Sequence, residues 1–276
     1  VPIAVKDNIC FQVERLTCGS RFLEKYRSPF SATATEKCED QGLICVGKAN
    51  MDEFAMGSST ENSYFGPSKN PWDISRVPGG SSGGSAVAVA SGQVSLSLGT
   101  DTGGSIRQPA SFCGIVGMKP TYGRVSRWGM VAFASSLDQM GPFSRTVEDS
   151  AYLLNAICGH DPKDSTSANI KTPDFTTELD KDVKGLKIGV PKQLMGDEIE
   201  SDIKHAILAS LDLLKAQGAT WELCDMPSLV TSVPVYYVIS TAEASANLSR
   251  YDGVRYTHRN TDAENLKDMY MMSRAE

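Results

Sequence analysis

The sequence lacks an excess of positive charge and any long hydrophobic segment. Its 276 residues include 27 lysines and arginines against 33 aspartates and glutamates, which gives a formal net charge of −6. Proteins that neutralise many phosphates need clustered basic residues, so this balance argues against direct binding of nucleic acid by the chain. No apolar run approaches the length of about 18 residues typical of a membrane span, and no basic-then-apolar leader is visible.

Cysteine and histidine are also used in ways that exclude common kinds of site. The seven cysteines are odd in number, scattered and free of C-x-x-C spacing, which fits neither a zinc site nor a disulfide framework. We therefore expect a reducing compartment and no metal. The three histidines, His160, His205 and His258, all lie outside the glycine-rich segments. A Ser-His-Asp triad consequently has no supporting sequence context.

Short apolar runs alternate with helical patterns along the chain. With 41% hydrophobic and 22% charged residues, the sequence can form a globular core. Alternation of strands and helices favours an α/β sheet that is covered by helices on both faces. The predicted strands are residues 3–5, 43–46, 96–98, 186–190 and 220–224.

Two helices have clear predicted boundaries. One is capped by Thr146 and stops at Gly159, and the other runs over residues 202–217. The apolar positions expected to share a face in the first helix are Val147, Ala151, Leu154 and Cys158. Those expected to form a stripe in the second are Ile203, Ile207, Leu211 and Leu214. The polar residues 161–178 predict a surface excursion between the two halves of the chain.

Two serines stand in glycine-rich segments 24 positions apart. Ser81 lies in VPGGSSGGS (residues 77–85), and Ser105 lies in GTDTGGSIR (residues 99–107). The first segment could be a plain glycine turn, a flexible linker or a phosphate-binding loop, although it lacks the lysine of a P-loop. An alanine and valine run from Ala86 favours a loop that leads into a helix. Ser105 follows a predicted strand, as in a nucleophile elbow, or it merely caps a tight turn.

Lys6 ends the first predicted strand, where a lysine is usually an edge residue with its amine in solvent. As a base it would have to be neutral. Holding a lysine neutral at pH 7 costs about 4–5 kcal/mol in water, so burial or a nearby cation would have to lower its pKa. Asp7 points to the opposite face of a continuing strand and need not hold Lys6 in its charged form.

These segments resemble the amidase signature enzymes. The matching motifs are VKDN (residues 5–8), GGSSGGS (79–85) and GTDTGGSIRQP (99–109). The resemblance implies the amidase signature fold, a large mixed twisted sheet, and a Ser-cisSer-Lys triad. In that triad Ser105 is the nucleophile, Ser81 the bridging serine after a cis Gly80–Ser81 peptide, and Lys6 the base. The amides of Thr102, Gly103 and Gly104 would form the oxyanion hole.

Within this family, three further segments resemble the glutaminase subunits of tRNA-dependent amidotransferases: residues 50–57, 135–142 and 247–256. The resemblance implies hydrolysis of glutamine through a glutamyl ester on Ser105, and transfer of ammonia to a partner. It implies a heterotrimer with subunits B and C, of which the partner binds misacylated Glu-tRNA(Gln) or Asp-tRNA(Asn) together with ATP and magnesium. No cofactor is expected in this chain. Substrate contacts are expected at Gly57, Asp101 and Tyr236, with Tyr237 as the alternative tyrosine.

The resemblance covers essentially the whole sequence. We therefore expect one amidase domain over residues 1–276, truncated at both ends, in the bacterial cytoplasm or alternatively in a mitochondrial or plastid matrix. The competing functional hypothesis is a free-standing amidase that acts on a small or hydrophobic amide. A non-catalytic scaffold is a third hypothesis, and the presence of all three triad residues argues against it.

Overall fold

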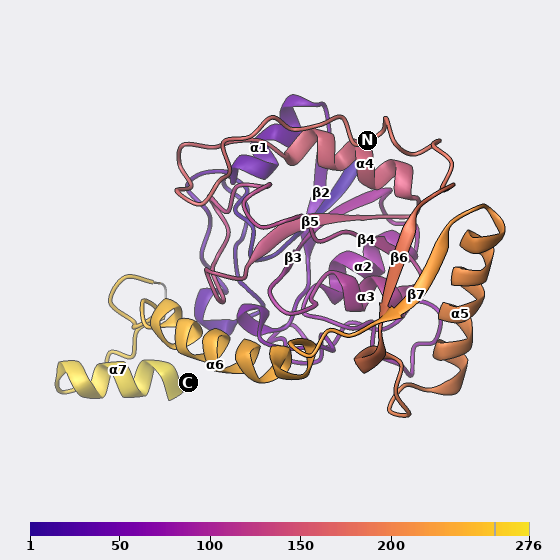
Figure 1. Cartoon of the computed structure of the whole chain (residues 1–276). Helices are drawn as coiled ribbons and strands as arrows, with labels where there is room; N and C mark the ends of the chain where they lie inside the picture. Colours follow the sequence, from indigo (N-terminus) through magenta and orange to yellow (C-terminus); the bar gives the residue numbers. More distant parts are fainter. Residues whose placement is uncertain (257, 276) are drawn as a thin grey trace. The chain divides into compact units, whose positions relative to one another are not determined.

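Five strands at the centre of Figure 1 form one mixed sheet in the order β2-β1-β3-β5-β4. The computed structural model describes residues 1–256 and 258–275. β1 is parallel to both of its neighbours, whereas β5 is antiparallel to β3 and to β4. The strands are β1 (Pro2–Lys6), β2 (Ile44–Ala49), β3 (Leu96–Asp101), β4 (Val116–Gly117) and β5 (Gln139–Ser144).

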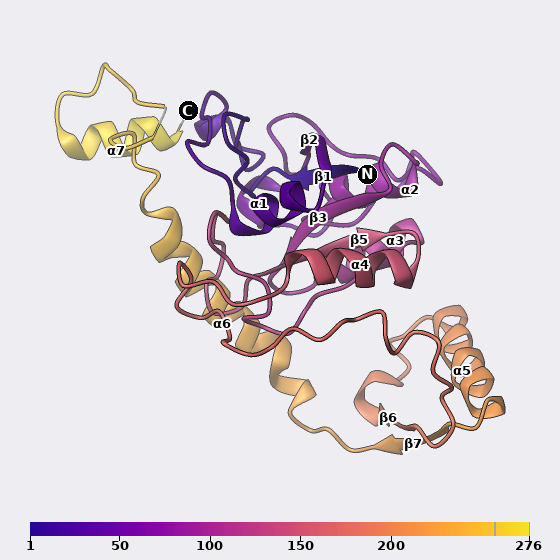
Figure 2. The ribbon, with the colours of Figure 1, turned by 90° about the horizontal axis from the view of Figure 1, so that it is seen from above.

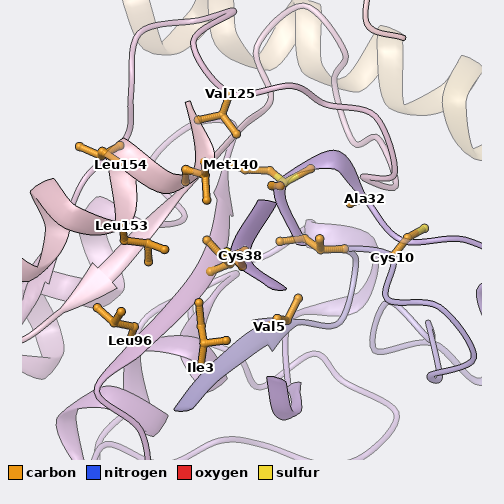
Figure 3. Packing of buried hydrophobic residues seen from close by; sticks show 14 of the residues in the cluster. Ile3, Val5, Cys10, Ala32, Cys38, Leu96, Val125, Met140, Leu153 and Leu154 are labelled. Atoms are coloured by element: carbon orange, nitrogen blue, oxygen red, sulfur yellow. The ribbon is translucent and has the colours of Figure 1, made fainter. Parts of the chain in front are cut away.

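Helices cover both faces of this sheet because successive side chains of a strand point to opposite sides. Ile3 and Val5 of β1 pack in one apolar cluster with Leu153 of α4, as Figure 3 shows. Ala4, between them, packs in a second cluster with Val89 of α2. The helices concerned are α1 (Thr33–Asp40) and α4 (Val147–Ile157) on the first face, and α2 (Gly83–Ala90) and α3 (Arg107–Cys113) on the second.

The chain divides into two compact units, residues 1–176 with 240–276, and residues 177–239. The sheet described above belongs to the first unit. In the second unit β6 (Lys187–Pro191) and β7 (Thr220–Cys224) are parallel, and α5 (Ser201–Ala216) packs beside β7 (Figures 1 and 2). The expectation of one domain over residues 1–276 stays a prediction.

The remaining helices lie in loops or in the C-terminal part of the chain. α6 begins in the second unit and ends in the first. Within the described ranges, every helix is too short or too polar to span a bilayer. The bounds are η1 (Arg21–Leu23), η2 (Glu53–Ala55), η3 (Lys192–Leu194), α6 (Leu229–Leu248) and α7 (Leu266–Ala275).

The predicted α/β sheet with helices on both faces is confirmed, and each predicted strand overlaps a strand of the structure, with ends that differ by up to three residues. Thr146 caps α4 as predicted, because its hydroxyl accepts a hydrogen bond from the amide of Asp149 at 3.0 Å. Gly159 follows the last turn with a φ of 127°. The glycine-rich segment leads directly into α2, which begins at Gly83, three residues earlier than expected.

Two predicted apolar faces were wrong in part. In α4, Ala151, Leu154 and Cys158 are buried as predicted, whereas Val147 is 60% exposed. Leu153 and Ile157 are buried as well. In α5, Ile203 is 53% exposed and Ile207 39% exposed. The sheet of this unit has only two strands, and of the four residues of the stripe Leu211 is buried and Leu214 partly buried.

Candidate active site

Lys6, the last residue of β1, has no exposed surface and directs its amine at two hydroxyl groups. Its Nζ lies 2.8 Å from Ser81 Oγ and 2.8 Å from Thr100 Oγ1, and the carbonyl oxygen of Thr100 is 3.4 Å away. The alternation of β1 produces this orientation, because Lys6 points to the same face as Ala4, toward α2. The edge-residue interpretation of Lys6 is therefore wrong.

Burial lowers the pKa of Lys6 to about 7, although the negative charges of Asp101, Asp52 and Asp138 act in the opposite direction. Desolvation dominates because a charged amine loses its hydration in the protein interior. Asp7 points away, as predicted. Its carboxylate lies 3.2 Å from the amine of Lys48 and accepts a hydrogen bond from the amide of Thr17. Close to neutral pH, a sizeable fraction of Lys6 is thus the neutral amine, which has a lone pair.

Ser81 lies in a loop where the main chain packs too closely for side chains. The peptide between Gly80 and Ser81 is cis, as the resemblance implied. A Cβ on Gly80 would lie 2.2 Å from Asp52 Oδ2, and one on Gly83 would lie 2.1 Å from the hydroxyl of Thr60. Glycine is therefore required at both positions, and the tight packing fixes Ser81 against Lys6. The neighbouring Ser82 instead donates to the carbonyl oxygen of Thr100 at 3.0 Å.

Ser105 lies in the turn between β3 and α3, and the side chain of Asp101 holds that turn through hydrogen bonds. The carboxylate of Asp101 accepts hydrogen bonds from the amides of Gly104 at 2.9 Å and Ile106 at 3.0 Å. It also pairs with Arg107 at 2.9 Å. Burial alone would raise the pKa of Asp101. The hydrogen bonds and the charge of Arg107, together with the hydrogen bonds from the amides of Ile106 and Gly104, lower that pKa below its ordinary value. The turn therefore rests on a buried, ionised carboxylate.

Gln108 of α3 connects the two serine loops. Its side-chain oxygen accepts from the amide of Gly80 at 2.9 Å, and its side-chain nitrogen donates to the carbonyl of Ser58 at 3.0 Å. Within the described residues, Ser81 and Ser105 share no direct hydrogen bond between their hydroxyls. The structure thus brings Lys6 and Ser81 into contact and holds the Ser105 turn against the loop of Ser81.

The predicted oxyanion donors differ from one another in their surroundings. The amide of Gly104 is already bound to Asp101, whereas a Cβ on Gly104 would meet no atom within 4 Å, so this side of the turn is open. Thr102 is fixed through its hydroxyl, which donates to Asp138 Oδ1 at 2.6 Å. We therefore regard the amides of Thr102 and Gly103 as the stronger candidates among the three donors.

Asp138 connects this turn to a cavity of about 320 Å³. Besides Thr102, its carboxylate accepts from the amides of Phe133 at 2.8 Å and Ala134 at 3.1 Å. Burial raises the pKa of Asp138, and these hydrogen bonds and the charge of Lys6 oppose that rise. The cavity lining includes Asp138, Arg127, Trp128, Ser135 and Asp164. One hydrogen bond thus joins the cavity wall to Thr102.

Sequence reasoning missed Thr100, Asn8 and Asp138 as parts of the site. Asn8 Nδ2 lies 3.1 Å from Thr100 Oγ1, which in turn contacts Lys6. Thr100 and Asn8 both belong to quoted motifs and carry hydrogen-bonding side chains. Their mutual contact could not be read from the sequence, because it depends on the parallel pairing of β1 with β3.

The three residues predicted to contact substrate, Gly57, Asp101 and Tyr236, form no hydrogen bond with the amine of Lys6 in the described chain. Gly57 is exposed and lies beside Asp52, since a Cβ there would be 2.4 Å from the carboxylate carbon. Asp101 has no exposed surface, which argues for support of the turn rather than contact with substrate. Tyr236 belongs to α6 in the second unit, where its ring contacts Tyr237 at 5.3 Å. Contact of these residues with substrate stays a prediction.

A sequence model of the Amidase family matches residues 1–276 of the protein. The chain belongs to the amidase family. The glutamyl-tRNA(Gln) amidotransferase A subunit of Carboxydothermus hydrogenoformans is 59% identical to it over 276 residues, 100% of this chain and 57% of that protein. The subunit of the same name from Geobacillus thermodenitrificans is 57% identical over the same lengths. The chain therefore spans about half the length of the curated relatives that it matches.

Solved structures of the amidase family share the fold. The glutamyl-tRNA(Gln) amidotransferase A subunit of Thermotoga maritima has a TM-score of 0.88 and 54% identity, over 90% of this chain and 54% of that one. The peptide amidase of Stenotrophomonas maltophilia has a TM-score of 0.85 and 32% identity, over 100% of this chain and 57% of that one. The resemblance to amidase signature enzymes and the fold that it implied are both confirmed. No group of three or more metal-ligating side chains occurs within residues 1–256 and 258–275.

Proposed function

We propose that this amidase hydrolyses an amide through Ser105, Ser81 and Lys6, as part of a glutamine-dependent amidotransferase. The observation that carries the proposal is the buried amine of Lys6, which lies 2.8 Å from Ser81 Oγ and has its pKa lowered to about 7. A lysine that is neutral near physiological pH and bound to a serine hydroxyl can serve as a general base. The adjacent turn presents a second serine among glycines.

In the proposed reaction, neutral Lys6 accepts the hydrogen of Ser81 while Ser81 accepts that of Ser105. Ser105 Oγ attacks the amide carbon, and the amides of Thr102 and Gly103 stabilise the oxyanion, each contributing roughly 3–4 kcal/mol. The carbon–nitrogen bond then breaks, and the amine leaving group takes the proton back through Ser81. Water hydrolyses the resulting ester by the same proton route. The hydrogen bond between the serines forms when substrate is bound, as catalytic contacts often do.

Glutamine is the proposed substrate, and ammonia the product passed to a partner subunit. The names of relatives that are 56–59% identical support this choice, since each is a glutamyl-tRNA(Gln) amidotransferase A subunit. Subunits B and C are the proposed partners in a heterotrimer. The net charge of −6 fits a division of labour in which a partner holds the misacylated tRNA, ATP and magnesium. Seven unpaired cysteines are in keeping with a cytoplasmic location.

The test is a glutaminase assay on the complete protein with and without its partner subunits and charged tRNA. We expect glutamate release to rise when these are added. Ser105→Ala should abolish turnover and the covalent acyl-enzyme seen by intact-protein mass spectrometry. Lys6→Ala should cripple turnover with the circular dichroism spectrum unchanged. The control is Ser91→Ala, at the end of α2, which should retain full activity. Unchanged rates in either triad variant would refute the assignment.

A free-standing amidase is the second candidate function. It is favoured by the TM-score of 0.85 to the Stenotrophomonas maltophilia peptide amidase, which matches the whole of this chain. Full activity of the protein alone on aryl, fatty or peptide amides, with no stimulation by partner subunits, would support this alternative. The same triad variants would then lose activity on those amides, so the two functions differ in substrate and not in chemistry.

A further inference from the structure

A buried side-chain amide lies directly behind the proposed base. Asn8 is 2% exposed, and its Nδ2 is 3.1 Å from the hydroxyl oxygen of Thr100. That oxygen is in turn 2.8 Å from Lys6 Nζ. The other polar atom of the amide, Asn8 Oδ1, is buried and has no hydrogen-bond partner within the described residues. A buried acceptor without a donor is costly and calls for an explanation.

The hydroxyl of Thr100 has a single hydrogen and lies between Asn8 and Lys6. When the nitrogen of Asn8 faces Thr100, it donates to one lone pair of the hydroxyl oxygen, and the amine of Lys6 donates an N–H to the other. A neutral amine has one lone pair. Because Lys6 uses an N–H toward Thr100, that lone pair is left to face Ser81, which is the direction that base catalysis requires.

This arrangement requires the hydroxyl oxygen of Thr100 to stay turned toward Lys6. The buried amide of Asn8 holds it there through the hydrogen bond from Nδ2. Without that bond the hydroxyl is free to rotate and to donate its own hydrogen to Lys6. The lone pair of the base would then be bound to Thr100 and could not accept the hydrogen of Ser81.

We propose that Asn8 is a positioning residue for the base, which acts through the hydroxyl of Thr100 and directs the lone pair of Lys6 toward Ser81. This inference rests on the proposed function. Asn8 itself contacts neither Ser81 nor Ser105 in the described hydrogen bonds. The charged and titratable groups that act on Lys6 come from other segments, namely Asp52, Asp101, Asp138 and the thiol of Cys18. None of the four is a hydrogen-bond partner of its amine in the described chain, so the direction of the lone pair depends on Ser81 and Thr100.

The test compares Asn8→Leu and Asn8→Asp in the complete enzyme with its partner subunits. Asn8→Leu removes both polar atoms, and we expect kcat to fall by about 10²-fold, as misplacement of a catalytic group does, while KM stays within about twofold. Asn8→Asp keeps the shape but adds a negative charge near Lys6, which favours the charged amine. The acid limb of the pH profile of kcat should therefore move upward by about one pH unit.

The matched control is Asn155→Leu in α4. Asn155 is likewise a hydrogen-bonded asparagine, accepting from the amide of Phe175 and donating to Asp174, but its helix lies on the other face of the sheet. It should keep the wild-type kcat and pH profile.

Wild-type kcat in Asn8→Leu would overturn the inference. An acid limb that does not move in Asn8→Asp would overturn it as well. The aspartate variant is isosteric with the wild type, so it still gives an answer if the leucine variant fails to fold. A purely structural role would lower thermal stability in Asn8→Leu and leave the kcat of the folded molecules unchanged. Activity that survives Lys6→Ala or Ser105→Ala would contradict the proposed function. Loss of activity in those two variants, with wild-type kinetics in the Asn8 variants, would contradict only this inference.

Discussion

At the scale of single residues, Lys6, the proposed base, opposes the stability of the fold that holds it. The pKa of its amine is about 7 in the folded chain and 10.5 as the ordinary value. Between these values the unfolded chain binds more protons, so the free energy of unfolding rises as the pH rises from 7 toward 10.5. The lysine therefore destabilises the folded state most at and below pH 7.

We expect Lys6→Met to remove this pH dependence. The difference in unfolding free energy between variant and wild type should shrink by about 3 kcal/mol between pH 7 and pH 10, because only the wild type gains stability over that window. Urea denaturation at the two pH values measures the difference, and contributions from other titrating groups cancel. A difference that stays constant with pH would show that the amine is charged in the folded protein at pH 7.

Gly80 is a position at which the neighbouring atoms leave no room for a side chain. Gly80→Ala would put a methyl group 2.2 Å from Asp52 Oδ2 and 2.9 Å from the amides of Ser59 and Thr60. We expect a loss of about 1–3 kcal/mol in unfolding free energy or more, together with loss of activity. Gly47→Ala is the control, since nothing lies within 4 Å of its added methyl group. Equal stability of the two variants in denaturant melts would contradict the packing of this loop.

The residues of the site could be predicted from the sequence only where a motif names them. Lys6, Ser81 and Ser105 followed from glycine spacing and resemblance, and the contact of Lys6 with Ser81 is present. The supporting role of Asp101 and the contact of Asn8 with Thr100 could not be predicted. Each depends on how a loop folds back in three dimensions, and residue type alone carries no information on that.

At the scale of elements, α3 and the loop before α2 depend on one another through Gln108. Gln108→Leu removes the acceptor of the Gly80 amide and the donor to Ser58. An unsatisfied amide next to Ser81 should loosen the loop, so we expect kcat to fall by about tenfold or more with the helix content unchanged. Steady-state kinetics and circular dichroism give the two readouts.

The conservative variant Gln108→Glu separates the two hydrogen bonds. Its carboxylate still accepts from Gly80 but cannot donate to Ser58, so it should retain more activity than the leucine variant. Equal losses in both variants would show that the bond to Ser58 is the one that matters.

Elements with apolar periodicity were predictable, and fully buried polar ones were not. β5 went unpredicted because it contains Gln139, Pro142 and Ser144, all of them buried. Gln139 is satisfied by the amide of Gly123 and the carbonyl of Val125, contacts that lie far outside any local pattern. Of the predicted face of α4, Ala151, Leu154 and Cys158 are buried, and only Val147, in the first turn, is exposed.

At the scale of the whole molecule, the free cysteines report on the integrity of the core. Five of the seven are buried, and burial raises the pKa of the Cys38 thiol to about 12 and those of Cys113 and Cys158 to about 11. Protonated, buried thiols react slowly. Only Cys45 and Cys224 are partly exposed.

We expect a thiol reagent to modify two cysteines rapidly in the native 276-residue chain and all seven after denaturation. Reducing agent should leave the melting temperature unchanged, because no disulfide joins these thiols. Mass spectrometry of the labelled peptides identifies the fast sites. Rapid labelling of Cys18 or Cys113 in the native chain would mean that the described core opens.

The position of Lys6 also limits how such an enzyme can be switched on. β1 is an interior strand, bonded to β2 on one side and β3 on the other, and the main chain just past Lys6 is still tied to Ala49. The backbone that carries the side chain of Lys6 is therefore held by hydrogen bonds on both sides. The amine of Lys6, the proposed proton acceptor, is therefore held in place, and changes in activity have to come from the serine loops or from admission of substrate.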